Sequence, residues 1–302
     1  MSGNPKKLRV YLPVLAILML VVSVSAQDFE KIQIETIKVT EGLYMLAGGG
    51  GNIGVSTGEN GVLLIDDQFG QLMDKIKTAI AKISPGQIRI VLNTNWHFDH
   101  VSGNEILGKA GALIIAHENS RKLMAAEQSH PEFNSKLPPY PEAALPALTF
   151  ADSMTLYFNG DEIQVTHIPH AHSDADIVIY FRKANVIHTG DLCFSAGYPF
   201  IDVTHGGSTN GMIEAADKIL GIIDTNTKLI PGHGPLTNRE GLQAFRDMLA
   251  AVRDRIAKLV KEGKTIDEVL ASKPTADFDK DRKAGMPPDM LVKIIYNDLS
   301  RR

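Results

Sequence analysis

Two imidazoles, a carboxylate and an amide stand close together in residues 95–100, which read Asn-Trp-His-Phe-Asp-His. The stretch follows an apolar run, residues 88–92, that is typical of a buried strand. Neutral imidazole and carboxylate together suit a borderline divalent ion such as zinc. A dense polar cluster at the end of a buried strand costs folding free energy unless a partner satisfies it, and a metal ion is such a partner. The stretch therefore predicts part of a metal site.

Three further candidate ligands each come at or after the end of another strand-like run. Ligands on loops at one edge of a rigid sheet are a common way to build a metal pocket. A single histidine beside a strand is more often a structural residue, but the joint occurrence of these groups favours one shared site. The further candidates are His172 after residues 162–168, Asp191 after residues 186–189 and His233 after residues 228–230.

The order of these residues resembles the metallo-β-lactamase superfamily, whose motif is His-x-His-x-Asp-His followed by a His, an Asp or Cys, and a His. The resemblance covers the chain from about residue 34 to the long C-terminal helix. It implies an α/β (α+β) fold, a four-layer αββα sandwich with a zinc site at one edge. The matching positions are Asn95, His97, Asp99, His100, His172, Asp191 and His233.

The resemblance also implies roles for these side chains. Zinc lowers the pKa of a bound water to about 7, so hydroxide would be available to attack a cyclic amide or ester. Asp99 would be the catalytic residue that orients this water and passes a proton to the leaving group. The implied metal ligands are His97 and His172 for the first zinc, Asp99, His100 and His233 for the second, and Asp191 as a bridge.

One position departs from the family motif, because Asn95 replaces its first histidine. An amide oxygen is a poor zinc ligand beside imidazole, so we expect one or two Zn²⁺ ions per chain with a weakened first site. Asp67, which ends a strand-like run, is expected to hold a ligand in place without binding metal itself. His170, two residues before His172, is expected to support the site or to be purely structural.

The N-terminal residues 1–26 have the layout of a secretory signal peptide. Lys6, Lys7 and Arg9 precede an uncharged apolar run of about 15 residues, which is followed by small residues. An uncleaved anchor is the alternative, but a span needs ~20 apolar residues. We expect a periplasmic or secreted protein with no stable membrane association after cleavage.

Composition limits the kinds of partner. The formal net charge is −4 and basic residues form no cluster, which argues against nucleic acid and leaves a small-molecule substrate. Cys193 is the only cysteine, so no internal disulfide can form. Residues 27–302 are expected to form a single domain with a helical C-terminal extension from about residue 239.

The pattern along the chain predicts two sheets packed face to face with helices outside. Proline-rich residues 130–148 are expected to form a long loop of the kind that often serves as a lid. Expected strands cover residues 32–39, 43–46, 52–57, 62–65, 88–93, 113–116, 153–158, 162–168, 177–181, 186–189 and 228–230. Expected helices cover residues 71–83, 104–110, 118–128, 209–223, 239–262 and 265–271.

Hydrolysis of a β-lactam is the favoured activity, since an exported location suits that substrate. No lysine follows directly after Asp191 to hold a substrate carboxylate, although many true β-lactamases have one. The alternatives are a lactonase, a thioesterase or a glyoxalase-type hydrolase, because one fold hosts many activities. A metal-binding protein that lost activity through Asn95 is the rival from another class.

Overall fold

Strand β4 (Gly61–Ile65) shows how the sequence builds the layers. Successive side chains of a strand point to opposite faces. Leu63 and Ile65 therefore enter the apolar core between the two sheets. Val62 and Leu64 enter a different core beneath helix α1 (Met73–Ala81). A strand that is apolar on both faces has to be covered on both faces, which is why helices lie outside the sheets.

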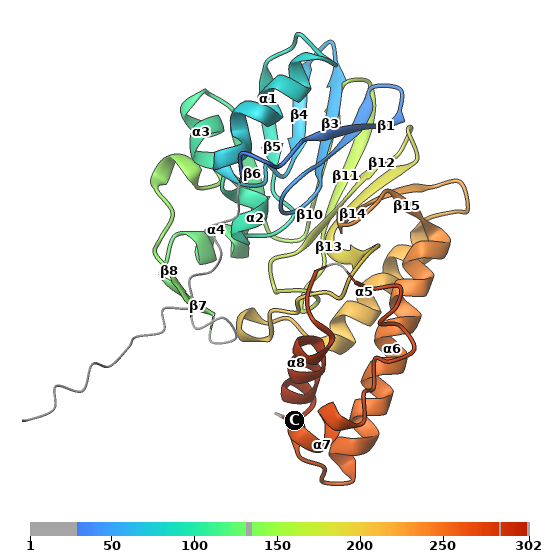
Figure 1. Ribbon diagram of the computed structural model, residues 1–302. Helices are drawn as coiled ribbons and strands as arrows, with labels where there is room; N and C mark the ends of the chain where they lie inside the picture. The colour runs from blue at the N-terminus through green and yellow to red at the C-terminus, as the bar shows by residue number, and fades with distance from the viewer. Residues whose placement is uncertain (1–28, 131–134, 284, 301–302) are drawn as a thin grey trace, which may run out of the picture.

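The computed structural model describes residues 29–130, 135–283 and 285–300, so the expected signal peptide lies outside the described residues. Two sheets face each other, and helices cover both outer faces (Figure 1). This arrangement confirms the expected αββα sandwich. In the part of the chain that is described, no helix combines the length and apolar character needed to cross a membrane.

The first sheet has seven strands in the order β1-β2-β3-β4-β5-β6-β9. Its first four strands are antiparallel neighbours, and β4, β5, β6 and β9 run parallel, so their carboxyl ends meet at one edge. The strands other than β4 are β1 (Glu35–Thr40), β2 (Leu43–Ala47), β3 (Ile53–Gly58), β5 (Ile88–Leu92), β6 (Leu113–His117) and β9 (Leu148–Phe150). Their connections include a 3-10 turn (Gly70–Leu72) and helices α1, α2 (Phe98–Val101), α3 (Asn104–Lys109) and α4 (Glu118–Met124).

The second sheet has six strands in the order β10-β11-β12-β13-β14-β15. Only β13 and β14 pair in parallel, and helix α5 (Thr209–Ile222) makes the crossover between them. The strands are β10 (Ser153–Phe158), β11 (Asp161–His167), β12 (Ile177–Phe181), β13 (Val186–Phe194), β14 (Lys228–His233) and β15 (Thr237–Asn238).

The C-terminal part is helical and packs on the outer face of the second sheet. Helix α6 (Arg239–Lys261) starts at Asn238, whose side chain accepts a hydrogen bond from the Gly241 amide. Phe245, Leu249 and Val252 recur at helical spacing and are fully buried in the core against β13 and α5. The remaining helices are α7 (Ile266–Ala271), closed at its start by a Thr265–Glu268 capping box, and α8 (Pro288–Ser300).

Several boundaries differ from those expected. Helix α4 ends at Met124, and the supposed loop 130–148 contains short elements: part of the hairpin β7 (Gln128–His130) and β8 (Ser135–Leu137), a 3-10 turn (Glu142–Ala144), and the start of β9. Strand β13 continues to Phe194, beyond the expected end at residue 189, because its pairing with β14 resumes after register shifts around Gly190. Helix α2, which starts within the polar stretch, was not expected.

Candidate metal centre

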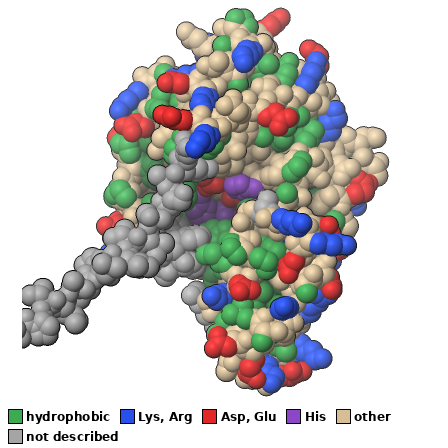
Figure 2. All heavy atoms as spheres, viewed as in Figure 1, with side chains coloured by type: hydrophobic (Ala, Val, Ile, Leu, Met, Phe, Trp, Pro, Cys, Tyr) green, Lys and Arg blue, Asp and Glu red, His purple; other side chains and the backbone are tan. Residues whose placement is uncertain are grey.

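The six candidate ligands lie in two neighbouring groups. On the surface, histidine side chains lie beside acidic ones in a hollow (Figure 2). The six ligands come from four places: the start of α2 after β5, the loop after β11, the interior of β13 and the last residue of β14. Asp191 thus lies inside a strand, whereas the sequence placed it beyond one. The ligand atoms form two groups, each with its atoms within 4.8 Å of one another: His97, His172 and Asp191, and Asp99, His100 and His233.

Local structure fixes the first of these segments. The Asn95 side-chain oxygen accepts a hydrogen bond from the His97 amide at 2.9 Å, which turns the chain into helix α2. Trp96 is fully buried against Met124 and Leu145 and anchors the stretch from below. Asp99 follows directly in the first turn of the helix, where a negative charge is favourable.

Glycines allow backbone to approach the ligands closely. A Cβ atom added at Gly51 would collide with the His100 ring, and one added at Gly232 would collide with the Asp191 carboxylate. The glycine turn after β2 and the Pro-Gly-His segment at the end of β14 therefore press against the two groups.

Each buried ligand histidine holds a carboxylate with the ring nitrogen that faces away from its group. A carboxylate accepts hydrogen bonds, so it fixes the proton on that nitrogen and leaves the other nitrogen free to bind a metal. The ring nitrogen opposite this contact is Nε2 in His100 and His172, and Nδ1 in His97. The contacts are His100 Nδ1 to Asp66 Oδ2 at 2.8 Å, His172 Nδ1 to Asp176 Oδ1 at 3.0 Å, and His97 Nε2 to Asp202 Oδ2 at 2.9 Å.

The charges in the two groups favour a bound cation. Burial opposes protonation of His100, but the carboxylates of Asp191 and Asp99 outweigh it and hold the pKa of His100 well above its usual value. For His233 the same balance of burial against Asp191 raises the pKa to about 9. Burial opposes ionisation of Asp99, yet His100 and His233 lower its pKa to about 2. The pocket therefore attracts positive charge, whether protons or a metal.

Two buried polar atoms that make no hydrogen bond also support a metal site here. His100 Nε2 and Asp191 Oδ1 are buried and make no hydrogen bond of normal geometry. Asp191 Oδ2 nevertheless lies 3.1 Å from His100 Nε2 and 3.4 Å from His172 Nε2, so one carboxylate faces both groups. Such orphaned atoms are costly without a partner. The donor set, imidazole nitrogen and carboxylate oxygen around a shared aspartate, fits divalent ions of the zinc type.

The second group is the more open of the two. The side chains of Asp99 and His233 are 19% and 27% exposed, whereas the other four ligands are almost fully buried. Phe194 stacks on the His233 ring with centroids 4.8 Å apart, and Phe200 lies edge-on to His97 at 5.8 Å. The groups thus have apolar walls on one side and an opening at Asp99 and His233.

Three residues that the sequence placed beside the ligands have different surroundings. Asn95 is fully buried and its Nδ2 donates to Asp191 Oδ2 at 3.3 Å, so its oxygen faces the His97 amide and not the metal groups. The Asp67 carboxylate accepts from the Gly103 amide and its backbone amide donates to the His100 carbonyl, while the ring of His100 contacts the neighbouring Asp66. His170 is exposed and pairs with Asp174.

The three carboxylates that contact the ligand histidines were not expected in that role from the sequence. Asp66 could have been found beside Asp67 at the end of β4, and Asp176 stands four residues after His172. Asp202 gives no such signal, since 105 residues separate it from His97. Only the fold brings these two side chains together.

The αββα sandwich and the two groups of histidine and aspartate side chains at its edge are features of metallo-hydrolase folds. Residues 46–233 match the family model described as "Metallo-beta-lactamase superfamily". The chain therefore belongs to the metallo-β-lactamase superfamily.

Curated relatives in this superfamily carry different activities in their names. A hydroxyacylglutathione hydrolase of Nitrosococcus oceani is 25% identical over 173 residues, covering 56% of this chain and 57% of its own. A linear primary-alkylsulfatase of Pseudomonas sp. is 22% identical over 254 residues, covering 70% of this chain and 47% of its own. The chain thus spans about half the length of these relatives.

Solved structures show the same fold. A sec-alkylsulfatase of Pseudomonas sp. superimposes with a TM-score of 0.67 at 18% identity, covering 87% of this chain and 50% of its own. A metallo-β-lactamase from Pontibacter korlensis gives a TM-score of 0.57 at 20% identity, covering 72% of this chain and 99% of its own.

Proposed function

We propose that the protein is a zinc-dependent hydrolase that opens a cyclic amide or ester, with a β-lactam as the leading substrate. The observation that carries this proposal is the open second group, where Asp99 and His233 are 19% and 27% exposed. Structural zinc sites are closed by their protein ligands, whereas catalytic sites keep an open position. The opening supports hydrolysis over a purely structural or storage role.

The residues of the two groups have distinct tasks in this proposal. Bound zinc supplies an activated water and polarises the bond to be cleaved. His97, His172 and Asp191 would hold one ion, and Asp191 also faces the second group. Phe194 and Phe200 shield one side of both groups from water, which strengthens electrostatic interactions there.

Asp99 is the proposed proton carrier. Its Oδ2 lies 3.3 Å from His233 Nε2 and 3.7 Å from His100 Nε2. The two histidines hold its pKa at about 2, so the carboxylate is ionised at neutral pH. Because it is also partly exposed, it can contact the water and the leaving group at the opening and carry a proton between them.

A specific observation favours an uncharged lactone or ester as the second candidate substrate. In residues 29–130, 135–283 and 285–300, the ion pairs made by His100, His172, His233, Asp99 and Asp191 join only histidines and aspartates. None of these pairs brings a lysine or arginine that would attract the carboxylate of a β-lactam. A neutral substrate needs no such cation.

The test is a substrate panel on the purified chain, residues 27–302, with added zinc. Nitrocefin tests β-lactams, and an aliphatic lactone tests the second candidate. A glutathione thioester and an alkyl sulfate cover the activities named for the relatives. We expect turnover of nitrocefin or the lactone that is lost in Asp99→Asn and kept in Asp217→Asn, a control with the same chemical change on helix α5, where Asp217 pairs with Arg246. No turnover of any substrate by protein shown to hold zinc would overturn the proposal.

We also propose that residues 1–26 are removed on export to the periplasm or medium. The basic residues, apolar run and small residues of this segment support the proposal. Mass spectrometry of the protein expressed from the full sequence should find Gln27 at its N-terminus. Recovery of the uncleaved chain in the membrane fraction would contradict it.

A further inference from the structure

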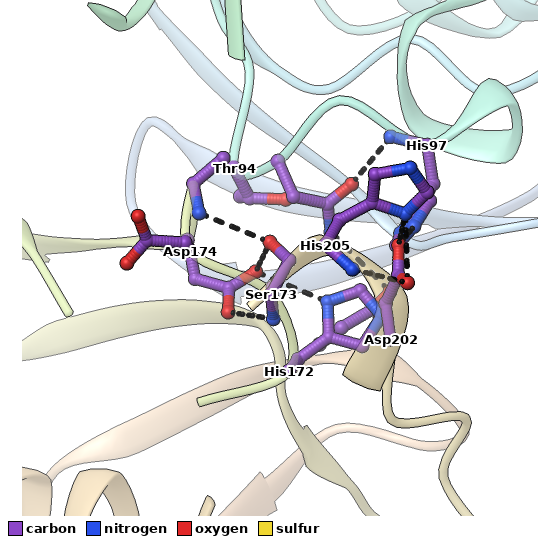
Figure 3. A network of polar contacts seen from close by, with 12 residues as sticks. Thr94, His97, His172, Ser173, Asp174, Asp202 and His205 are labelled. Carbon is purple, nitrogen blue, oxygen red and sulfur yellow. Dashed lines mark hydrogen bonds and ion pairs between the residues drawn. The ribbon is translucent and has the colours of Figure 1, made fainter. Parts of the chain in front are cut away.

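One carboxylate outside the ligand set joins an unusual number of groups around the first metal group. Asp202 is fully buried and precedes a 3-10 turn (Val203–His205). Its carboxylate lies within hydrogen-bond distance of His97 Nε2 at 2.9 Å and His205 Nδ1 at 2.8 Å, and it accepts a hydrogen bond from the His205 amide at 3.1 Å (Figure 3). Two imidazoles from distant parts of the chain therefore share one carboxylate.

The main chain of Asp202 contacts the other histidine of the same group. Its amide donates to the His172 carbonyl at 2.7 Å. Its own carbonyl accepts from the Gly207 amide at 2.8 Å, which closes the turn that follows. The side chain of Asp202 thus holds His97 and its backbone holds His172, so one residue fixes the spacing of the two imidazoles.

We propose that Asp202 is the positioning residue that keeps the first metal group able to bind an ion although Asn95 replaces an imidazole. The Asn95 oxygen is taken by the His97 amide, which leaves two imidazoles and Asp191 as donors. With so few donors, the orientation of His97 matters more. A carboxylate that accepts a hydrogen bond from Nε2 fixes the orientation of the ring and makes the other ring nitrogen a stronger ligand.

A purely structural role would not require this geometry. Capping the 3-10 turn uses only the contact from Asp202 Oδ1 to the His205 amide. The contact to His97 is made by the other oxygen, Oδ2. The His205 ring, edge-on to Trp96 at 4.8 Å, holds that carboxylate from the opposite side. The second oxygen therefore contacts the ligand His97 as well as the His205 ring, and the contact to His97 is one that capping the turn does not need.

The inference rests on metal binding at this site, as the proposed function does, but not on any reaction. The test compares Asp202→Asn with Asp66→Asn, the matched change at the carboxylate that holds His100 in the second group. Zinc affinities are measured by competition with a chromophoric chelator. The absorption spectrum of the cobalt-substituted protein reports each site separately. Reference variants His172→Ala and His233→Ala assign each ion to its group.

We expect Asp202→Asn to weaken the first-group ion by about 10- to 100-fold and to leave the second-group ion unchanged. Asp66→Asn should do the reverse. Unchanged affinities in Asp202→Asn, or equal losses at both groups, would overturn the inference. Nitrogen-15 NMR of the histidines in the wild-type chain checks it without a variant: a His97 ring protonated on Nδ1 in the metal-free protein contradicts it.

The two proposals fail in different ways. A wild-type chain that binds no metal ion would contradict both the proposed function and the proposed role of Asp202. A wild-type chain that binds ions, shows the selective loss in Asp202→Asn and hydrolyses nothing would remove the proposed function and support the role of Asp202.

Discussion

Asn95→His restores the imidazole that the family motif has at this position, and its consequences can be worked out from the contacts of Asn95. The side chain makes two buried hydrogen bonds, one from the His97 amide at 2.9 Å and one to Asp191 at 3.3 Å. Each contributes about 1 kcal/mol net, so without metal the variant should lose about 2 kcal/mol of unfolding free energy. For a chain of this size that lowers Tm by about 4–8 °C.

With zinc the difference in stability should shrink, because a third imidazole can join His97 and His172. A tenfold gain in affinity for the first-group ion corresponds to about 1.4 kcal/mol. At saturating zinc, where the wild type also binds the ion, this gain offsets most of the roughly 2 kcal/mol lost with the hydrogen bonds. Thermal unfolding with chelator and with zinc, together with chelator competition, measures both effects.

Asn95→Ala is the matched control for this experiment. It removes the same two hydrogen bonds and adds no ligand, so it should lower Tm both with chelator and with zinc, and gain no zinc affinity. If Asn95→His binds the first ion no more tightly than the wild type does, then Asn95 does not weaken that site and the reasoning is refuted.

Three further outcomes follow from the structure. Asp99→Asn should lower kcat by about 10²- to 10⁴-fold on any substrate that is turned over, because the amide cannot carry a proton; wild-type rates in this variant would remove Asp99 from the chemistry. Burial and the stacked His167 ring lower the pKa of His117, so between that pKa and the value of about 6.5 in the unfolded chain stability rises with pH and is complete above it. His117→Gln should therefore show a smaller gain in urea stability between pH 5 and 7.5 in chelator, and an equal gain would contradict this. Phe245→Ala in α6 should cost about 3–5 kcal/mol of unfolding free energy in urea, since the ring is fully buried against β13 and α8; a loss below 1 kcal/mol would show that the C-terminal helices are not part of the core.

The spacing of apolar residues predicts the buried strands and helices well, because it depends only on residues that are close together in the chain. The alternation in β4 and the spacing of apolar residues in α6 require coverage of defined faces, and the two sheets and their outer helices follow. Short or irregular elements carry no such repeat. The helix α2, the strand β9 and the extension of β13 past Gly190 depend on contacts with distant backbone, so the pattern along the chain does not reveal them.

The sequence alone determined which residue types gather for metal chemistry. His97, Asp99 and His100 are close in the chain, and their spacing together with His172 is enough to indicate a metal site. The structure places all six candidate ligands in two adjoining groups. The metal ligands can be inferred from the sequence because few residue types other than histidine, aspartate, glutamate and cysteine bind metal ions of this kind.

Only the tertiary structure decided what holds these ligands. The partner of His97 is Asp202, 105 residues away, and that of His100 is Asp66 and not its neighbour Asp67. Asp66 and Asp67 are neighbours, but only the Asp66 side chain contacts the His100 ring, while that of Asp67 contacts the Gly103 amide. The backbone at Asp66 has a positive φ of 63°, a conformation that the sequence does not announce. Such choices are made by sheet packing and close backbone approach, which act between segments that are distant in sequence.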